Sequence, residues 1–385
     1  MTESASARES ARGDATQGGL TRRDGSRAGE RLRVAIVGGG FMAEVHSRAA
    51  RASRADLAGV VSSTAERSAA AAERLGIARA YGSLDELLAD DTVDVVHVTT
   101  PNALHAKQAG AVLAAGKHVI CEKPLATTTA DAEELVRAAE GRVATVPFIY
   151  RFHPMVREAR HRFASGQAGH VLSINASYLQ DWLLGAGDDN WRVDAAQGGR
   201  SRAFADIGSH LVDLVEFVSG DRVSRVSATK RTVFAERASH SAITTEDAVA
   251  VVVETEGGAL GTLLVSQVAP GRKNRLWLEI AGTAESVAFD QEQPETLWVG
   301  RRAGSLLVPR DADQLSADAA RLCVVPSGHP QGYQDAFNAF VADSYAAVAG
   351  EEPDGLPRFT DGLRAVRITD AVLDSAESGT WIEMG

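Results

Sequence analysis

The chain has 385 residues, of which 44% are hydrophobic, and its formal net charge is −11. A chain of this length usually forms more than one hydrophobic core, so we expect two domains. The acidic balance argues against a nucleic-acid partner, which requires a clustered basic face. No apolar stretch reaches the roughly 20 residues of a membrane span. The two cysteines, Cys121 and Cys323, are too few and too far apart for a disulfide framework or a zinc site, so no metal is expected.

Residues 1–30 are rich in Ser, Ala, Gly, Arg and acidic residues, and they lack the apolar core of a signal peptide. This composition predicts a disordered tail and favours a cytoplasmic location for the protein. Ordered structure is expected from Arg31 onward.

Residues 31–150 alternate between short apolar runs and helical patterns. This alternation is typical of a doubly wound parallel sheet with helices on both faces, and it predicts a Rossmann dinucleotide-binding domain. Gly76 is expected to end one helix, and Ser83 is expected to cap another. The expected strands are 32–37, 56–61, 93–99, 117–121 and 143–149. The expected helices are 45–54, 65–75, 84–89, 103–115 and 129–139.

Residues 151–385 have a different pattern, with long β-branched or alternating runs and few helices. This pattern predicts an α+β domain with an open-faced, mostly antiparallel sheet that binds the substrate and mediates oligomerisation, and its C-terminal helices could pack back on the Rossmann domain. The expected strands are 172–178, 225–233, 248–255, 260–268, 275–281, 285–289, 296–299 and 305–308. The expected helices are 207–219, 334–349 and 362–375, with loops at 185–188 and 195–202.

Residues 38–43 follow the G-x-G-x-x-G/A pattern between a strand and a helix. Glycines in this pattern allow a tight turn and close approach of a pyrophosphate, which the helix N-terminus then attracts. A glycine-rich turn also occurs by chance, so the pattern gains its meaning from its βαβ setting. The residues expected to contact a dinucleotide here are Gly38, Gly40, Phe41 and Met42.

The second strand ends in hydroxyl residues instead of the acid that often binds the ribose of NAD. These residues are Ser62, Ser63 and Thr64, and Arg67 follows. Hydroxyls with a guanidinium suit a 2′-phosphate, which favours NADP over NAD while leaving both open. In the alternative reading, the hydroxyls only cap the next helix.

Two further strand ends carry polar groups on the same edge of the sheet, where doubly wound sheets bind ligands. Thr99, Thr100, Pro101 and Asn102 could contact the nicotinamide ribose, or they could only cap the following helix. Lys123, at the end of the strand 117–121, could stabilise negative charge on a reacting oxygen.

Asp206 and His210 are four residues apart and would share one face of a helix. The carboxylate could orient or charge the imidazole, which could take a proton from a hydroxyl group as hydride leaves the same carbon. An Asp-x-x-x-His pair on its own is more often a helix cap with an unrelated histidine. The presence of Lys123 favours the catalytic interpretation.

These motifs resemble those of the Gfo/Idh/MocA family (glucose–fructose oxidoreductase, inositol dehydrogenase and rhizopine-catabolism proteins). The resemblance runs from about Val34 to the C-terminus. It rests on residues 37–42, 100–105, 116–126 and 206–210, with Glu122-Lys123-Pro124 its most diagnostic part. It implies a hydride transfer between NAD or NADP and a ring hydroxyl or keto group of a sugar, glycoside or cyclitol. It also implies acid–base roles for Lys123 and His210, support from Asp206, and positions near the cofactor for His105 and Glu122.

Residues 178–182, 191–192 and 198–199 are similar to a sugar-oxidising branch of this family that includes levoglucosan dehydrogenase-like members. By this analogy the sugar pocket is lined by Gln180, Trp191, Arg192, Tyr150 and Arg151. Tryptophans 182 and 191 could instead belong to the core or to a domain interface.

The chain departs from the family pattern at Ile149, where many relatives have Asn. His329, in a loop before the last long helix pair, could reach the pocket or have no role. Residues 63–67 resemble those of NADPH-using ketosugar reductases, so a biosynthetic ketosugar reductase is one alternative, and a non-catalytic NAD(P)-binding regulatory protein is another. An open sheet face requires a cover, which predicts a homodimer or homotetramer.

Overall fold

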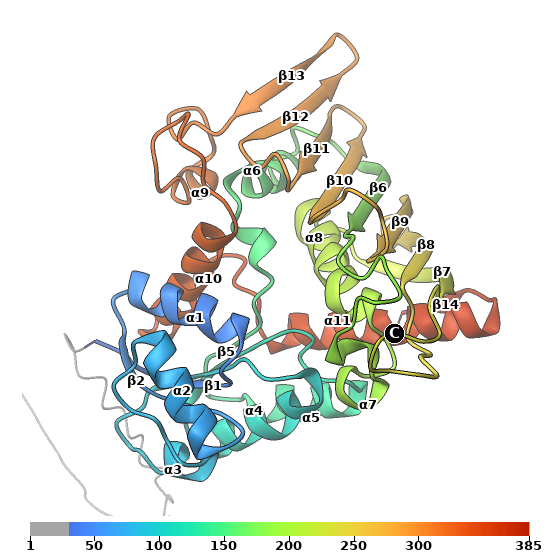
Figure 1. Ribbon diagram of the computed structural model, residues 1–385. Coiled ribbons are helices and arrows are strands. Elements are labelled where there is room, and N and C mark those ends of the chain that lie inside the picture. Colours follow the sequence, from blue (N-terminus) through green and yellow to red (C-terminus); the bar gives the residue numbers. More distant parts are fainter. Residues whose placement is uncertain (1–30, 385) are drawn as a thin grey trace, which may run out of the picture. The chain divides into compact units, whose positions relative to one another are not determined.

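Two β-sheets organise the structure, a computed structural model that describes residues 31–384 (Figure 1). The tail expected at residues 1–30 lies outside the described residues. The first sheet is built from residues 33–145 and the second from residues 171–383, so the predicted fold class, a Rossmann sheet followed by a mostly antiparallel sheet, is confirmed. Within residues 31–384, no helix combines the length and apolar content needed to cross a membrane.

The first sheet is parallel, with the strand order β2-β1-β3-β4-β5. Its strands are β1 (Arg33–Val37), β2 (Asp56–Val61), β3 (Val95–Val98), β4 (His118–Cys121) and β5 (Ala144–Thr145). The helices between them are α1 (Phe41–Ala52), α2 (Ala65–Leu75), α3 (Leu84–Leu88), α4 (His105–Ala114) and α5 (Thr129–Ala138). The topology reverses between β1 and β3, so their carboxyl ends form the crevice in which such sheets bind ligands.

Helix α1 begins earlier than the sequence pattern predicts. It starts at Phe41, directly after the glycine turn, instead of at Val45. Its first turn therefore lies against the edge of the sheet where β1 and β3 end, which brings unpaired backbone N–H groups to the crevice.

The second sheet has the order β13-β12-β11-β10-β6-β9-β8-β7-β14, and all neighbours are antiparallel except β6 and β9. Its strands are β6 (Val171–Leu179), β7 (Val223–Arg231), β8 (Ala248–Thr255), β9 (Leu260–Ser266), β10 (Arg275–Gly282), β11 (Ser286–Asp290), β12 (Thr296–Arg301), β13 (Gly304–Pro309) and β14 (Ile382–Glu383).

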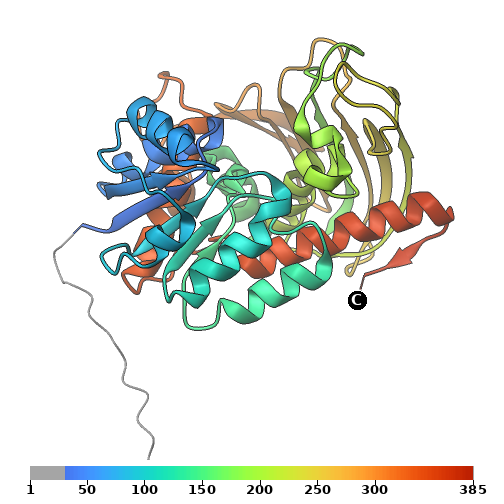
Figure 2. The same cartoon turned by 60° about the horizontal axis from the view of Figure 1, so that its bottom comes forward.

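Helices cover only one face of this sheet (Figure 2). Three of them pack on the strands: α6 (Pro154–Ala164), α8 (Ser209–Ser219) and α11 (Phe359–Ser378). Two further helices are short, α7 (Ala195–Gly198) and α9 (Ala317–Ala320). Helix α10 (Tyr333–Val348) packs on α1, and α11 also packs on α5, so both long C-terminal helices contact the Rossmann part of the chain.

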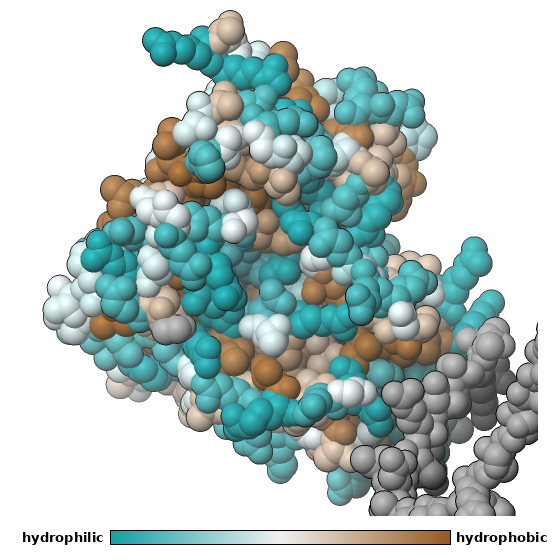
Figure 3. Space-filling model, turned by 180° about the vertical axis from the view of Figure 1, so that it is seen from behind, coloured by the Kyte–Doolittle hydropathy of each residue, from teal (hydrophilic) through white to brown (hydrophobic). Residues whose placement is uncertain are grey.

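The opposite face of the nine-stranded sheet carries exposed apolar side chains. Val252 on β8 is 42% exposed, and Leu264 on β9 is 45% exposed. Seen from behind, the surface shows hydrophobic residues in several places among hydrophilic ones (Figure 3). This open face is therefore present as the sequence predicts.

Helix α6 was not predicted because its charged residues face inward. Arg157 is 1% exposed and Glu158 is 4% exposed. The Arg157 guanidinium donates to the carbonyl oxygens of Arg151 and Asp354, and Glu158 accepts from the Ser316 N–H group. Buried charges hide the apolar periodicity from which an amphipathic helix is recognised.

Candidate active site

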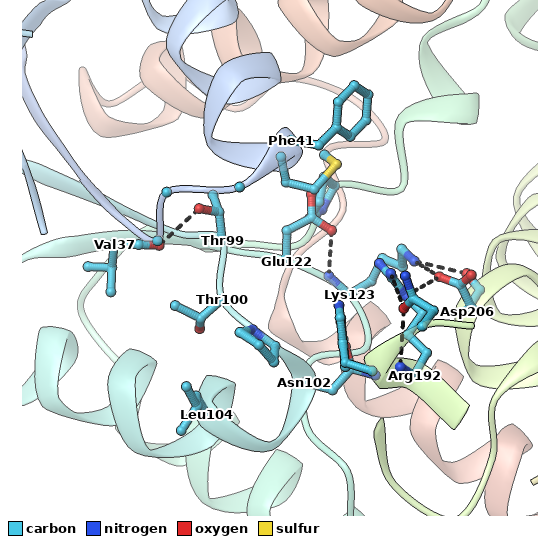
Figure 4. Close-up of a pocket in the computed structure, with 18 of the residues that line it drawn as sticks. Val37, Phe41, Thr99, Thr100, Asn102, Leu104, Glu122, Lys123, Arg192 and Asp206 are labelled. Carbon is cyan, nitrogen blue, oxygen red and sulfur yellow. Dashed lines mark hydrogen bonds and ion pairs between the residues drawn. The ribbon is translucent and has the colours of Figure 1, made fainter. Parts of the chain in front are cut away.

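A cavity of about 930 Å³ runs from the glycine turn of the Rossmann sheet to the edge of the second sheet at which β6 ends (Figure 4). The carboxyl ends of β1, β2, β3 and β4 form one part of its wall. The other part is formed by β6, the start of α8, a helical turn at Trp191–Val193, and α10. The structure thus brings residues from both parts of the chain to a single cavity.

The glycine turn has the geometry that the G-x-G-x-x-G/A pattern requires. Gly38 has a φ of +112°, and a Cβ atom there would lie 2.6 Å from Thr99 Oγ1. Thr99 Oγ1 donates to the Val37 carbonyl oxygen at 2.9 Å, which holds β1 and β3 together at this point. At Gly40 no side chain caps α1, so the first N–H groups of this 12-residue helix remain free for an anion. These residues fit the pyrophosphate of a dinucleotide.

The end of β2 carries hydroxyl and guanidinium groups on the cavity wall. Ser62, Ser63 and Arg67 line the cavity, and Arg67 Nη1 donates to Ser63 Oγ at 3.0 Å. Thr64 does not line the cavity: its hydroxyl accepts from the Arg67 N–H group at 3.2 Å and caps α2. The capping interpretation thus holds for Thr64, because its hydroxyl is bonded within its own helix start, whereas the two serines face the cavity.

The loop after β3 lies beside the glycine turn. Thr99, Thr100, Pro101 and Asn102 all line the cavity, and Asn102 Nδ2 donates to the Gly198 carbonyl oxygen at 3.0 Å. His105 does not line it. Its fully buried imidazole contacts the carbonyl oxygens of Thr100 and Pro124 at 2.8 and 2.7 Å, so it stabilises the loop after β3.

Lys123 and Asp206 form a partly buried ion pair, and each side chain is 14% exposed. Lys123 Nζ lies 2.6 Å from Asp206 Oδ1 and donates to the Asp206 carbonyl oxygen at 3.0 Å. Gln267 Nε2 donates to Asp206 Oδ2 at 2.8 Å, and Arg192 Nε lies 3.5 Å from Oδ1. Burial opposes ionisation of this carboxyl group, but the charges of Lys123 and Arg192 and the hydrogen bond from Lys123 hold its pKa well below the usual range.

His210 lies in an aromatic pocket at the wall of the same cavity. Its ring centroid is 5.1 Å from that of Tyr150 and 5.7 Å from that of Phe148. Burial, reinforced by the positive charge of Lys123, lowers the pKa of His210 to about 3, so the imidazole is neutral at physiological pH. Its Nδ1 atom has no hydrogen-bond partner among residues 31–384.

The expectation that the Asp206 carboxylate orients His210 is corrected. The two residues lie where a π-helical turn (Phe204–Gly208) runs into α8, and both line the cavity. Both carboxylate oxygens of Asp206, however, are engaged by Lys123, Arg192 and Gln267. The carboxylate therefore directs its hydrogen bonds to these three residues, although its negative charge still raises the pKa of His210, and the imidazole packs against aromatic rings.

Four of the five residues expected in the sugar pocket line the cavity, namely Tyr150, Gln180, Trp191 and Arg192. Arg151 does not, which corrects that expectation. It is 8% exposed, and its guanidinium pairs with Asp213 and Asp361 outside the cavity. A buried guanidinium is stabilised only by such partners, so it turns toward the two carboxylates.

Asn274 was missed by the sequence analysis, although it organises this end of the cavity. Its Oδ1 atom accepts from Tyr178 Oη at 2.8 Å and from Gln180 Nε2 at 2.7 Å, and its Nδ2 atom donates to Tyr150 Oη at 3.2 Å. Gln180 Oε1 also accepts from Trp182 Nε1 at 2.7 Å. Nothing in the local sequence marks this asparagine, since it lies in an ordinary polar turn before β10. Tyr178, Asn190 and Tyr333 also line the cavity without having been predicted.

The loop that carries Trp191 is held by one buried arginine. Arg237 donates to the carbonyl oxygens of Leu183, Gly185 and Asp188 at 3.0, 2.9 and 2.9 Å. It also pairs with the fully buried Asp247 at 2.8 Å. Because this loop leads directly into Trp191 and Arg192, the segment between β7 and β8 stabilises the end of the cavity that these two residues line. His329, by contrast, is exposed and does not line the cavity.

A glycine turn at a helix start, a lysine–aspartate ion pair and a buried histidine share one cavity here, on a Rossmann sheet. This combination is typical of nicotinamide-dependent oxidoreductases, and comparison with known proteins places the chain in that class. Residues 32–148 match the family description "Oxidoreductase family, NAD-binding Rossmann fold", and residues 156–288 match "GFO/IDH/MocA C-terminal domain". The chain belongs to the Gfo/Idh/MocA family of oxidoreductases.

Similar proteins cover almost the whole described chain. A levoglucosan dehydrogenase of Pseudarthrobacter phenanthrenivorans is 29% identical over 396 residues, which cover 92% of this chain and 98% of that protein. A solved structure of levoglucosan dehydrogenase with NADH and levoglucosan has a TM-score of 0.86 at 30% identity, covering 92% of this chain and 100% of that chain. D-xylose 1-dehydrogenase (NADP(+)) 2 of Haloferax volcanii is 36% identical over 179 residues, which cover 46% of this chain and 54% of that protein. The chain is thus an enzyme, and the non-catalytic alternative is set aside.

Proposed function

We propose that the chain transfers a hydride between NADP(H) or NAD(H) and a ring hydroxyl or keto group of a sugar, glycoside or cyclitol. The observation that carries this proposal is the Lys123–Asp206 pair, which shares one cavity with a neutral His210 and the glycine turn. Relatives that act on levoglucosan and D-xylose support the substrate class.

The nicotinamide ring, when bound, accepts or supplies the hydride. Lys123 donates a hydrogen bond to the reacting oxygen and stabilises the negative charge that develops there. Asp206 holds the Lys123 ammonium group in place through two contacts, to a carboxylate oxygen and to the backbone carbonyl oxygen.

His210 exchanges the proton of the reacting hydroxyl group. Because its imidazole is neutral, it can accept that proton when an alcohol is oxidised. Tyr150 and Phe148 keep the ring in one orientation by packing at its edges and faces. No single direction of reaction follows from this arrangement, so sugar oxidation and ketosugar reduction use the same groups.

The substrate end of the cavity suits a polyhydroxylated ring. The indole of Trp191 offers a flat face for C–H surfaces, and Arg192 lies over that ring at 4.5 Å. Gln180 and Asn274 line this end of the cavity, and each has a second amide hydrogen, beyond the one that it donates within the protein, that can be donated to a ring hydroxyl. The test is a panel of sugars, glycosides and inositols with each nicotinamide cofactor, followed by the absorbance of the reduced ring. Lack of turnover across the whole panel would contradict the proposal.

We also propose NADP as the preferred cofactor. Ser62, Ser63 and Arg67 line the cavity at the end of β2, and no carboxylate from residues 31–384 lines the cavity beside them. A 2′-phosphate would gain hydroxyl donors and a guanidinium there, whereas the ribose hydroxyls of NAD would lack their usual acidic acceptor. A strong NADPH preference together with slow oxidation of free sugars would favour the reductase alternative.

We further propose that the enzyme is a homodimer or homotetramer assembled through the open face of the nine-stranded sheet. Val252, Leu260 and Leu264 lie exposed on neighbouring strands of this sheet, with exposures of 42%, 57% and 45%. Contiguous apolar surface of this kind is unfavourable in water and marks an interface. Light scattering on the purified protein measures the state of assembly, and a monomer at micromolar concentration would refute this part of the proposal.

A further inference from the structure

Behind the cavity wall, four buried side chains form a continuous chain of hydrogen bonds. Tyr345 Oη on α10 lies 2.9 Å from His97 Nε2 on β3. His97 Nδ1 lies 2.9 Å from His46 Nδ1 on α1. His46 Nε2 lies 3.1 Å from Oε1 of Glu122, which lines the cavity directly after β4. Neither histidine has any exposed surface, and the proposed mechanism uses neither of them.

The hydrogen bond between His46 and Glu122 has the same direction whatever the charge of His46. An ionised carboxylate can only accept, so His46 Nε2 carries a hydrogen and donates it. In a neutral His46 the Nδ1 atom then accepts, so His97 donates from Nδ1 and accepts at Nε2 from the Tyr345 hydroxyl. If His46 were instead an imidazolium, the two outer bonds would reverse, but the donor on Glu122 would be the same. In either case Glu122 receives a hydrogen bond from His46.

The hydrogen bond from His46 offsets the unfavourable effect of burial on the ionised Glu122 carboxylate. Glu122 is 5% exposed, and burial works against its ionisation. The hydrogen bond and the charge of His46, followed by the charges of Lys123 and His105, nevertheless lower the pKa of Glu122. Its second oxygen accepts from the Lys123 N–H group at 3.1 Å. The titratable groups that face it are Cys121, His46, His105, Lys123, His210 and Tyr333.

We infer that His46, His97 and Tyr345 are positioning residues that keep Glu122 ionised on the wall of the cofactor cavity. The inference rests on the proposed function, because it concerns the dinucleotide that this cavity holds. Oxidised NADP carries one more positive charge than NADPH. A fixed carboxylate on the cavity wall therefore favours the oxidised form over the reduced form. These three residues thereby set the ratio of the enzyme's affinities for NADP⁺ and NADPH.

The test compares the dissociation constants of NADP⁺ and NADPH for the whole apoenzyme, measured by quenching of tryptophan fluorescence from about pH 5 to pH 8. Titration of the 2′-phosphate affects both forms alike and cancels in their ratio. The wild-type ratio is expected to stay constant. In His46→Leu the pKa of Glu122 rises, so Glu122 takes up a proton as the pH falls, and NADP⁺ loses affinity relative to NADPH by several-fold. His46→Gln, which keeps an amide donor, should restore much of the wild-type behaviour.

The remaining variants locate the effect. His97→Leu and Tyr345→Phe should change the ratio of the NADP⁺ and NADPH dissociation constants in the same direction as His46→Leu, by smaller amounts. If the histidine variants do not fold, Tyr345→Phe alone tests the inference. Adding His46→Leu to Glu122→Gln should change the ratio no further, because the chain acts through this carboxylate. His118→Leu, which removes a histidine of β4 that does not line the cavity, serves as the control.

A pH-independent ratio in His46→Leu and Tyr345→Phe, with both cofactors still bound, would overturn this inference and leave the proposed function intact. Failure of the wild-type protein to bind NADP⁺, NADPH, NAD⁺ and NADH would overturn both. A further change of the ratio when His46→Leu is added to Glu122→Gln would also refute the inference, since the histidines would then act by another route.

Discussion

Removal of the Lys123 ammonium group is the most direct test of the proposed chemistry. Lys123→Met keeps the length of the side chain but loses the donor that contacts Asp206 Oδ1 at 2.6 Å. Removing one such electrostatic or acid–base group typically lowers the rate by a factor of about 10² to 10⁴. At about 1.4 kcal/mol for each factor of ten, the barrier rises by about 3 to 5.5 kcal/mol.

The effect on stability should be smaller than the usual cost of breaking a buried pair, about 3–5 kcal/mol. Arg192 Nε remains 3.5 Å from the same Asp206 oxygen, and Gln267 still donates to the other oxygen. The carboxylate therefore keeps a cation and a hydrogen bond. Thermal unfolding of Lys123→Met should show a modest loss, while the loss of turnover is large.

The assay follows the absorbance of the reduced nicotinamide with the best substrate of the panel, and fluorescence quenching reports cofactor binding separately. Lys117→Met is the matched control, because Lys117 lies directly before β4 and Lys123 lies two residues after it. Its ammonium group donates to the carbonyl oxygens of Asp90 and Val93 at 2.7 and 3.1 Å, and it does not line the cavity. This control should lower the melting temperature and preserve kcat. If Lys123→Met keeps more than about a tenth of the wild-type kcat, the role assigned to Lys123 is wrong.

Three further predictions follow from other contacts of the site. Arg67→Ala should weaken NADPH binding by about tenfold or more and leave NADH binding nearly unchanged, because it removes a charged partner of the 2′-phosphate; equal effects on both cofactors in a binding titration would exclude the phosphate contact. Arg237→Met should raise the KM of the sugar several-fold without changing the cofactor dissociation constant, since it releases the loop before Trp191; a loss confined to thermal stability would reduce Arg237 to a purely structural residue. Val252→Glu combined with Leu264→Glu should convert the oligomer into a monomer in light scattering, because it places charges on the open sheet face; an unchanged mass would locate the interface elsewhere.

Local chemistry explains why many elements could be predicted. Helix α2 spans Ala65–Leu75 as expected, because Thr64 caps its start and Gly76, with a φ of +60°, ends it. Strand β8 likewise has the predicted bounds, Ala248–Thr255, since its buried and exposed residues alternate. Such signals lie within a few residues of the element that they define.

Contacts between distant segments account for what could not be predicted. Arg151 could as readily have faced the sugar as the carboxylates of Asp213 and Asp361, which lie 62 and 210 residues further along the chain. Asn274 reaches the cavity only because β10 pairs with β6 and brings it beside Tyr178.

The sequence by itself determined the class of fold and the position of the glycine turn. It also determined which lysine, aspartate and histidine were predicted to form the site, because each of these predictions depends on residue type and short spacing. Tertiary structure alone decided that Asp206 contacts Lys123, that burial keeps His210 neutral, and that two buried histidines lie behind Glu122. The physical reason is that a charged or polar side chain takes whichever partners compensate its burial, and the folded chain supplies those partners from segments far apart in sequence.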